Sequence, residues 1–267
     1  MRTADEDLEA FGSFAGKLAD VARGMAAKHF RQEFTVRRKA DGTVVTNADE
    51  AAERAIRSGI EARYPAHGII GEEYGVRPSS GPFTWVIDPI DGTKAFIAGR
   101  PTFGILIALC RDGVPVVGVM DQPFTGERWV GVDGVGTTYN GRPIRVRPID
   151  RIEEAILGCG NPMRTRDRLG RFYDDLDRRA LVSLYGGDCY LYGLMACGHV
   201  HTIVDTGLGP VDFCALVPIV RNAGGVVTAA DGVALTATSK EGGVLACASV
   251  GLHAELVKSA STALTRS

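Results

Sequence analysis

Three short stretches of the chain place acidic side chains beside turn residues. Glu72-Glu73 follow the apolar run 68–70, Asp88-Pro89-Ile90-Asp91-Gly92-Thr93 follow the run 85–87, and Asp212 ends the stretch 209–212. Each stretch alone is compatible with a solvated turn or a helix cap. Taken together they offer five carboxylates next to turns, which is a pattern suited to hard divalent cations.

The second stretch predicts a geometry. Pro89 disfavours helix at the residue before it, so Asp88 is expected in extended backbone. Asp88 and Asp91 can then point into one pocket with the Ile90 carbonyl between them. Clustered carboxylates repel one another unless cations lie among them. An open, partly hydrated site with oxygen ligands suits Mg2+.

Gly92 and Thr93 are expected at a helix N-terminus, where backbone N–H groups bind phosphate oxygens. Carboxylates, a divalent cation and a phosphate cradle predict metal-assisted hydrolysis of a phosphoester. Ser183 and Cys189 lack the turn context of a covalent nucleophile. His199 and His201 are expected to be a surface or packed pair rather than a zinc site.

These stretches resemble the two signatures of inositol monophosphatase-type phosphatases, the second being Pro210-Val211-Asp212 followed by Gly224-Gly225. The resemblance runs from residues 47–49 to Gly225. It implies an α/β (α+β) fold, a layered αβαβα sandwich similar to that of inositol monophosphatase and fructose-1,6-bisphosphatase. It also implies two or three Mg2+ ions per active site, with Mn2+ as an alternative, frequent inhibition by Li+, and a homodimer.

The same resemblance assigns metal ligands by position. Glu72, Asp88 and the carbonyl of Ile90 would hold the first ion, and Asp88, Asp91 and Asp212 would hold the second. Asp88 would therefore bridge the two ions. Glu73 belongs to the motif, but a place behind the metal ligands or in solvent is an equal alternative for it.

Catalytic and phosphate-binding residues follow from the resemblance as well. Glu72 and Thr93 would position the attacking water, and Asp49 would accept a hydrogen bond from Thr93 and support it as a proton relay. Gly92 and Thr93 would bind the phosphate. Lys39, in the stretch 37–42, would approach the phosphate or a third metal ion.

The substrate is expected to be set by residues away from the metals. Asp188 and Asp205 would face the leaving alcohol, and two acids favour a cationic group such as the amine and imidazole of L-histidinol phosphate. The resemblance to the histidinol-phosphatase branch rests on the stretches 93–101, 121–123, 127–129 and 187–190. Lys94, Val211 and Asp205 depart from that pattern at the pocket rim. The expected substrate-binding residues are Asp91, Asp188, Asp205, Arg100 and Asp212, with a solvated turn as the alternative for Arg100.

Two other functions remain open. The first keeps the chemistry and changes the substrate to inositol 1-phosphate, a broader range of sugar phosphates, or a nucleotide 3′-phosphate. The second is a metal-binding or phosphate-binding regulator without catalysis, which the intact acidic stretches disfavour.

Composition narrows the class of protein. The 267 residues carry 30 basic and 32 acidic side chains, a formal net charge of −2, and no basic block, which argues against nucleic acid as a partner. The longest apolar run, 103–110, is far too short to span a membrane. The six cysteines form no CxxC pair, and the stretch 1–8 lacks the apolar core of a secretory signal. We expect a cytoplasmic enzyme acting on a small phosphorylated metabolite.

The elements that must position the acids follow from periodicity. Apolar residues recur every three or four positions over 5–30, at Leu8, Phe11, Phe14, Leu18, Val21 and Met25, which predicts a helix. Asn47 and Glu50 are spaced as a capping box for a second helix ending before Pro65. Strands are expected at 69–70, 85–87, 104–110, 115–120 and 128–131. Asp-Gly and Asn-Gly turns between several of them predict an antiparallel arrangement.

Beyond residue 150 the pattern alternates. Helices are expected at 167–179, 188–197, 211–222 and from 252, and strands at 181–184, 200–204, 226–227 and 244–247. Alternation of this kind predicts a second α/β layer. The expected division is a half 1–150 with the metal motif and a half 151–267 with the substrate pocket, packed as one catalytic unit.

Overall fold

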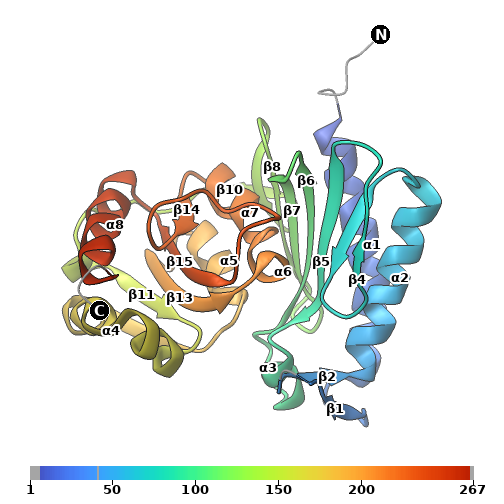
Figure 1. Ribbon diagram of the computed structural model, residues 1–267, viewed down its shortest axis with the longest axis horizontal. Helices are drawn as coiled ribbons and strands as arrows, with labels where there is room; N and C mark the ends of the chain where they lie inside the picture. The colour runs from blue at the N-terminus through green and yellow to red at the C-terminus, as the bar shows by residue number, and fades with distance from the viewer. Residues whose placement is uncertain (1–6, 41, 265–267) are drawn as a thin grey trace.

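The structure is a computed structural model that describes residues 7–40 and 42–264. Its helices are α1 (Leu8–His29), α2 (Asn47–Arg63), α3 (Thr93–Ile97), the 3-10 helix η1 (Ile152–Glu154), α4 (Pro162–Arg179), α5 (Tyr190–Ala196), α6 (Pro210–Phe213), α7 (Leu216–Asn222) and α8 (Val250–Leu264). Figure 1 shows five layers: α4 and α8, a five-stranded sheet, the short helices α5 to α7, an eight-stranded sheet, and α1 with α2. The predicted αβαβα sandwich is confirmed.

The first sheet has eight strands in the order β10-β9-β8-β7-β6-β5-β3-β4. Its strands are β3 (Gly68–Gly71), β4 (Gly75–Arg77), β5 (Phe83–Asp91), β6 (Gly104–Arg111), β7 (Val114–Gln122), β8 (Glu127–Val132), β9 (Gly136–Tyr139) and β10 (Arg142–Ile144). Neighbours are antiparallel except β3 and β5, which run parallel. The five predicted strands are present, and the expected antiparallel arrangement holds for most of the sheet.

The second sheet has five strands in the order β12-β11-β13-β15-β14. They are β11 (Ile156–Cys159), β12 (Val182–Tyr185), β13 (Thr202–Leu208), β14 (Val226–Ala229) and β15 (Gly242–Cys247). Two further strands, β1 (Val36–Arg38) and β2 (Val44–Thr46), form a small ribbon beside α3. Sequence patterns missed β1, β2, β4 and β9 to β11, all of which are only three or four residues long.

Helix α1 packs on the first sheet through small residues. Its buried positions include Ala15, Ala19, Ala22 and Ala26, whereas Val21, predicted on the apolar face, is 48% exposed. The prediction that Val21 lies on the buried face is therefore wrong, because the face of α1 that packs on the sheet is formed by these alanines and Leu18. Positions 5 and 6 of the predicted helix lie outside the described residues.

The start of α2 differs from the expected capping box. Thr46 is the cap residue and Asp49 its partner, one position before Asn47 and Glu50. Asn47 Oδ1 instead accepts a hydrogen bond from the Thr35 N–H at 3.0 Å, and Glu50 pairs with Arg37. Thr46 and Asn47 are both residue types that cap helices. Thr46 is the cap because Asn47 and Glu50 are engaged with Thr35 and Arg37.

The C-terminal half contains two further differences. The predicted helix 211–222 is divided into α6 and α7, because Pro218 cannot donate a hydrogen bond to the residue four positions earlier. Helix α4 begins at Pro162, capped by Asn161, five residues before the predicted start, and bends at Gly170 with φ of 46°.

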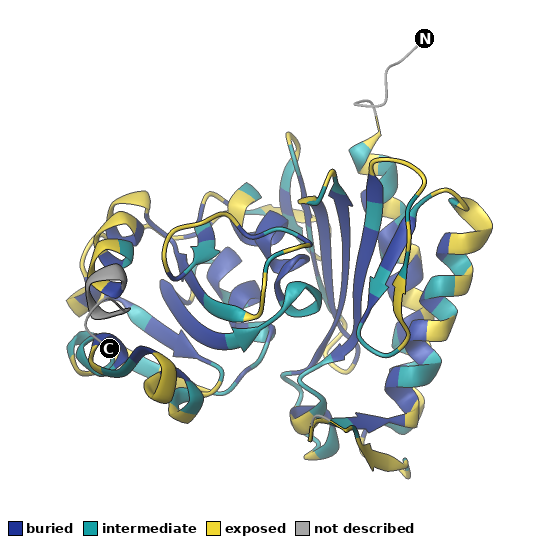
Figure 2. Ribbon diagram, viewed as in Figure 1, coloured by how far each residue is buried: buried dark blue, intermediate teal, exposed yellow. Residues whose placement is uncertain are grey.

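Most residues of the two sheets and of the helices between them are buried, whereas the outer helices carry exposed residues, as Figure 2 shows. Trp85 and Trp129 are among the largest fully buried side chains of the first sheet. The six cysteines are free, and five of them are buried. Among the described helices, none combines the length and the apolar character needed to cross a bilayer.

Candidate active site

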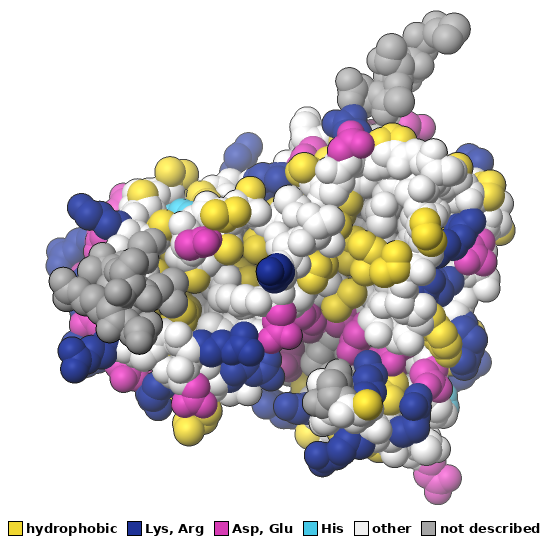
Figure 3. All heavy atoms as spheres, viewed as in Figure 1, with side chains coloured by type: hydrophobic (Ala, Val, Ile, Leu, Met, Phe, Trp, Pro, Cys, Tyr) yellow, Lys and Arg dark blue, Asp and Glu magenta, His cyan; other side chains and the backbone are white. Residues whose placement is uncertain are grey.

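A cavity of about 650 Å³ lies where the ends of β5, β13 and the short helices meet. Seven carboxyl side chains and four cationic side chains line it, contributed by both sheets and by α3, α4 and α6. Figure 3 shows a hollow with Asp and Glu side chains inside and Lys and Arg side chains along its border. Such a concentration of acids, two of them buried and four partly buried, suits a cation-binding site.

The end of β5 carries Asp88 and Asp91. The pairing of β5 with β6 shifts register between these two residues, so the strand bends there and both carboxylates face the cavity. Asp88 Oδ1 accepts the Ile90 N–H at 3.0 Å, and Asp91 Oδ2 accepts the Cys189 N–H at 2.8 Å. Each backbone contact fixes the direction of one carboxylate.

The third acid, Asp212, arrives from the other half of the chain. It lies in α6, where its Oδ2 accepts the Gly209 N–H at 2.6 Å. Oxygen atoms of Asp88, Asp91 and Asp212 all lie within 4.8 Å of one another. The sequence prediction that these three acids meet is therefore matched by the geometry.

Burial raises the pKa of all three carboxyl groups. Repulsion from Glu72, Asp91 and Asp212 adds to the raised pKa of Asp88, and repulsion from Asp188 and Asp212 adds to that of Asp91. The pKa of Asp212 rises to about 6, with burial as the first cause. A cation among these acids would oppose both effects, since it stabilises the ionised form.

The donor set fits a hard divalent metal. Asp88, Asp91 and Asp212 supply oxygen atoms only, and one oxygen of each lies within 4.8 Å of the other two, close enough for all three to contact a shared cation. The Ile90 carbonyl and Glu72 also line the cavity. These five residues are the ones that would hold metal, as the sequence predicts.

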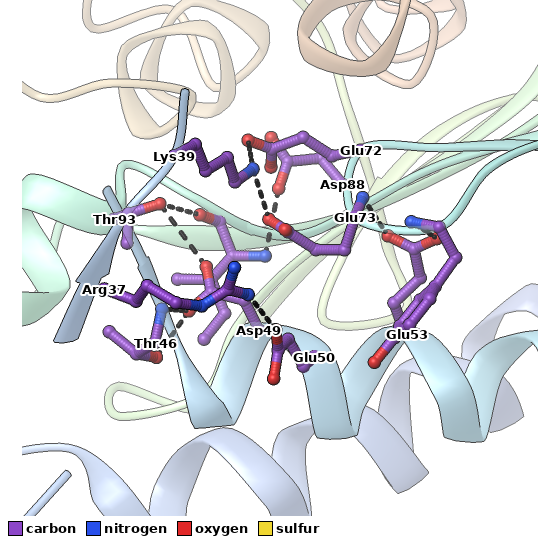
Figure 4. A network of polar contacts seen from close by, with 12 residues as sticks. Arg37, Lys39, Thr46, Asp49, Glu50, Glu53, Glu72, Glu73, Asp88 and Thr93 are labelled. Carbon is purple, nitrogen blue, oxygen red and sulfur yellow. Dashed lines mark hydrogen bonds and ion pairs between the residues drawn. The ribbon is translucent and has the colours of Figure 1, made fainter. Parts of the chain in front are cut away.

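Glu72 and Glu73 share a lysine. Lys39 Nζ lies 3.0 Å from Glu72 Oε1 and 2.7 Å from Glu73 Oε1, as Figure 4 shows. Burial lowers the pKa of Lys39, but both glutamates outweigh this effect, so its pKa is raised overall. Burial raises the pKa of Glu73 to about 7. The Glu73 side chain is 5% exposed and, unlike Glu72 and Lys39, does not line the cavity.

Thr93 and Asp49 are also brought together. Thr93 Oγ1 lies 3.4 Å from Asp49 Oδ1 and 3.2 Å from the Ile90 carbonyl, so its hydroxyl hydrogen has two acceptors (Figure 4). Asp49 is fully buried and accepts hydrogen bonds from the Thr46 N–H and hydroxyl. Burial raises the pKa of Asp49, and the Thr46 contacts oppose this rise.

Gly92 begins α3 beside Asp188. Its φ is 82°, and a Cβ atom there would lie 2.9 Å from the Asp188 carboxyl carbon, so only glycine fits. Asp188, which has a φ of 49°, accepts a hydrogen bond from Thr102 Oγ1 at 3.3 Å. Burial raises the pKa of Asp188, against the opposing effects of Thr102, Arg100 and Lys94.

Asp205 lines the cavity but is already engaged. Its Oδ1 accepts the Gly160 N–H at 2.6 Å, and its Oδ2 accepts the Tyr192 hydroxyl at 3.3 Å. Burial raises its pKa. Of the two acids expected to face the leaving alcohol, Asp188 therefore has fewer contacts to the scaffold. Arg100 lines the same wall as Asp188, next to Gly186.

Sequence reasoning missed several residues of the cavity. Asn161 and Arg164, at the start of α4, and Glu241 also line it, whereas Lys94 lines it as expected for the pocket rim. The dipeptide Asn161-Pro162 is a cap followed by proline, and this signal would have moved the start of α4 to the cavity. Glu241 lies in an irregular segment with no such signal.

The two histidines do not form a metal site. His201 is buried, and its Nδ1 accepts the Ile156 N–H at 2.9 Å. Across the described residues, the cluster of Asp88, Asp91 and Asp212 is the one group of three or more potential ligands found this close together. The expected packed role of His201 therefore agrees with its contacts.

Five layers and a partly buried carboxylate cluster beside a helix N-terminus define the class of protein, a metal-dependent phosphoric monoester hydrolase. Comparisons with known proteins agree. The model of the inositol monophosphatase family matches residues 7–265. The chain belongs to the inositol monophosphatase family.

Individual relatives show how close the likeness is. The chain is 41% identical over 227 residues to the bifunctional phosphatase IMPL2, chloroplastic, of Arabidopsis thaliana, covering 84% of this chain and 66% of that one, just under two thirds. It is 36% identical over 211 residues to a histidinol-phosphatase of Chlorobaculum parvum, covering 78% and 82%. A solved inositol monophosphatase from Zymomonas mobilis superposes with a TM-score of 0.84 at 38% identity, over 99% of this chain and 100% of that one.

Proposed function

We propose that the protein is a Mg2+-dependent phosphatase that hydrolyses L-histidinol phosphate to L-histidinol and phosphate, a step of histidine biosynthesis. The observation that carries this proposal is the position of Asp188, whose carboxylate lines the cavity beside Gly92 and Asp91. A negative charge next to the phosphate cradle suits an alcohol with an amine or imidazolium group. Relatives that include a histidinol-phosphatase support it.

The residues that would hold Mg2+ are Glu72, Asp88, Asp91, Asp212 and the Ile90 carbonyl. When bound, the ions supply an activated water and neutralise the phosphate charge. Thr93, whose hydroxyl lies 3.4 Å from Asp49 Oδ1, would hold that water together with Glu72 and pass its proton onward. The N–H groups of α3 after Gly92 would bind the phosphate. Lys39 would limit repulsion between Glu72 and the incoming phosphate.

Asp188 provides the test of the substrate. A charge-assisted hydrogen bond contributes about 1.5–3 kcal/mol, so Asp188→Asn should lower kcat/KM for L-histidinol phosphate about 10- to 100-fold. p-Nitrophenyl phosphate has no cationic group, and its kcat/KM should fall much less. The ratio of the two losses removes any general damage to the site.

Asp205→Asn is the matched control, because Asp205 bonds to Gly160 and Tyr192. It should lower kcat/KM for both substrates by similar factors. Equal losses in Asp188→Asn would instead assign Asp188 to the scaffold and contradict the proposed role.

A second candidate keeps the chemistry with inositol 1-phosphate, other sugar phosphates or a nucleotide 3′-phosphate as substrate. The observation that favours it is the full-length likeness to an inositol monophosphatase, together with Lys94 and Arg100, which offset the charge of Asp188. A kcat/KM panel of histidinol phosphate, inositol 1-phosphate, fructose 1,6-bisphosphate and adenosine 3′,5′-bisphosphate separates the candidates. Preference for inositol 1-phosphate would replace the histidinol assignment.

We also propose that the protein is a cytoplasmic homodimer. Sedimentation at several protein concentrations tests the dimer, and a monomer throughout would contradict it.

A further inference from the structure

The stretch 127–129, at the start of β8, presents side chains to both faces of the first sheet. Successive residues of a strand point to opposite faces. Arg128 pairs with Asp20 of α1 at 2.6 Å, whereas Glu127 and Trp129 contact α5. Glu127 and Trp129 therefore lie on the face that packs against the short helices between the two sheets (Figure 1).

Glu127 and Trp129 hold α5 at its two ends. Glu127 Oε2 accepts the hydroxyl of Tyr190, the first residue of α5, at 2.8 Å. Trp129 Nε1 donates to the sulfur of Cys197, the C-terminal cap of the helix, at 3.2 Å. Gly193 lets the helix approach closely between these contacts, since a Cβ atom there would lie 2.8 Å from the Trp129 ring. The helix is thus fixed to β8 along its length.

The other oxygen of Glu127 accepts a hydroxyl from a different element. Tyr139, on β9, donates to Oε1 at 2.8 Å. The Tyr139 and Tyr190 rings both contact Trp129, with centroids 5.0 and 5.5 Å from that of the Trp129 ring. The hydrogen bond to Glu127 raises the pKa of Tyr139 to about 12, and burial and Glu127 raise the pKa of Tyr190. Both tyrosines are therefore protonated donors at neutral pH, and they differ mainly in the element that each one holds.

The residues just before Tyr190 belong to the active site. The Cys189 N–H donates to Asp91 Oδ2 at 2.8 Å. Asp188, beside Gly92, has a φ of 49°, a conformation that is costly for a residue with a Cβ atom and persists only where the surroundings hold it. A shift of the first residue of α5 would therefore reach both the donor that orients Asp91 and the Asp188 carboxylate.

We propose that Glu127 is a positioning residue of the phosphatase site, which fixes Tyr190 and thereby the Cys189 N–H that orients Asp91. Glu127 does not line the cavity, so its effect on the site is carried by α5. This inference goes beyond the proposed function. It depends on metal binding by the clustered acids and not on L-histidinol phosphate as substrate.

Two tyrosine variants test it as a matched pair. Tyr190→Phe and Tyr139→Phe each remove one hydroxyl from the same carboxylate and keep the ring on Trp129, but only Tyr190 belongs to α5. Loss of a group that orients a metal ligand weakens metal binding about 10- to 100-fold, so a donor that is loosened rather than lost should weaken it about 3- to 10-fold. Titration calorimetry with Mg2+ should show this rise in Kd for Tyr190→Phe and the wild-type Kd for Tyr139→Phe.

Activity and stability separate positioning from packing. With p-nitrophenyl phosphate and saturating Mg2+, kcat should fall in Tyr190→Phe, because a less firmly oriented Asp91 places the ion less accurately, and should stay at the wild-type level in Tyr139→Phe. The unfolding temperature in EDTA reports loss of either hydrogen bond and should fall in both variants. A merely structural role would lower this temperature without changing the Kd for Mg2+ in either variant.

A double-mutant cycle shows whether Glu127 acts through Tyr190. Glu127→Ala should raise the Kd for Mg2+ at least as much as Tyr190→Phe does, and the double variant should raise it no further. If Glu127→Ala does not fold, as judged by circular dichroism, the two tyrosine variants decide the matter.

An unchanged Kd in Tyr190→Phe, an equal rise in Tyr139→Phe, or additive effects in the double variant would overturn the inference, as would a wild type that binds no Mg2+. A wild type that leaves L-histidinol phosphate intact while the tyrosine variants differ as expected would reject the proposed substrate alone.

Discussion

At the residue scale, the three clustered carboxylates are all oriented by a hydrogen bond from a backbone N–H. Asp88, Asp91 and Asp212 each accept a backbone N–H on one oxygen, from Ile90, Cys189 and Gly209 respectively. Two of these donors are within three residues of the acid, whereas Cys189 comes from the other half of the chain. Each carboxylate is therefore oriented before a metal binds, and one of the three orientations depends on the tertiary fold.

Asp88→Asn should separate metal binding from folding. The amide keeps the Oδ1 acceptor for Ile90 but removes the charge, so turnover should fall below detection with Mg2+ present. Without metal the variant should be more stable than the wild type, because buried like charges no longer repel each other. Unfolding in EDTA should move upward by about 2–4 °C for each 1 kcal/mol gained. A folded Asp88→Asn enzyme with near-normal kcat would contradict the bridging role.

Thr93→Ala tests the proton relay. General acid–base catalysis contributes about 10²- to 10⁴-fold, so loss of the hydroxyl should lower kcat by a factor in this range with a smaller change in KM. Thr93→Ser keeps the hydroxyl 3.4 Å from Asp49 and should recover most of the activity. A change confined to KM would assign Thr93 to substrate binding instead.

At the scale of elements, the N-terminus of α2 links helix capping to the active site. Thr46 caps the helix and also holds Asp49, which lies next to Thr93. The sequence pattern predicts the helix but indicates Asn47 as its cap. Thr46 and Asn47 are each followed by an acidic residue three positions later, so the spacing fits both equally well. Contacts of Asn47 with Thr35 and of Glu50 with Arg37 settle the choice, and these depend on the ribbon of β1 and β2.

Thr46→Ala should therefore affect both stability and catalysis. Loss of a cap costs about 1 kcal/mol, and Asp49 loses one of its donors, so kcat should decrease as well. Asn47→Ala, which removes only the contact to Thr35, is the neighbouring control and should leave kcat closer to that of the wild type. Thermal unfolding and kcat of both variants provide the comparison. A larger loss in Asn47→Ala would favour the cap that the sequence suggested.

Elements with strong periodicity were the predictable ones. The four longest strands of the first sheet, β5 to β8, and helices α1 and α2 carry their pattern in the chain itself. Short strands such as β11 and β4, and the break before α7, depend on partners or on a single proline. Arg164 was missed as a cavity residue because its position depends on carbonyls of β13 that lie more than 40 residues further along the chain.

At the scale of the molecule, the cavity joins the two sheets. Asp88 and Asp91 belong to the end of β5, and Asp212 to α6 beyond β13, so a metal held by all three connects both halves of the chain. The motifs predict which acids lie close together. The distances between these acids and their burial could not be predicted, because they depend on how the two sheets pack. Metal binding should consequently stabilise the whole fold and not only a loop.

Acid should weaken this stabilisation. The pKa of Asp212 is raised from 3.8 to about 6 in the metal-free fold, and those of Asp88 and Asp91 are raised as well. Such groups bind protons in the folded state before they do in the unfolded chain. Lowering the pH from 7 toward 4 therefore stabilises the metal-free fold through these groups, while protons compete with the metal for the same oxygens.

The difference in unfolding temperature between Mg2+ and EDTA buffers should thus be largest near pH 7 and shrink steadily toward pH 5. At a metal concentration about 100 times Kd, the stabilisation is roughly 2.7 kcal/mol. His201 and His253, whose pKa values burial lowers, destabilise the fold on acidification in both buffers and largely cancel in the difference. Calorimetry of the wild type and of Asp212→Asn provides the measurement, and the variant should show a smaller difference at pH 7. A difference that stays constant from pH 7 to pH 5 would mean that the clustered acids do not hold the metal.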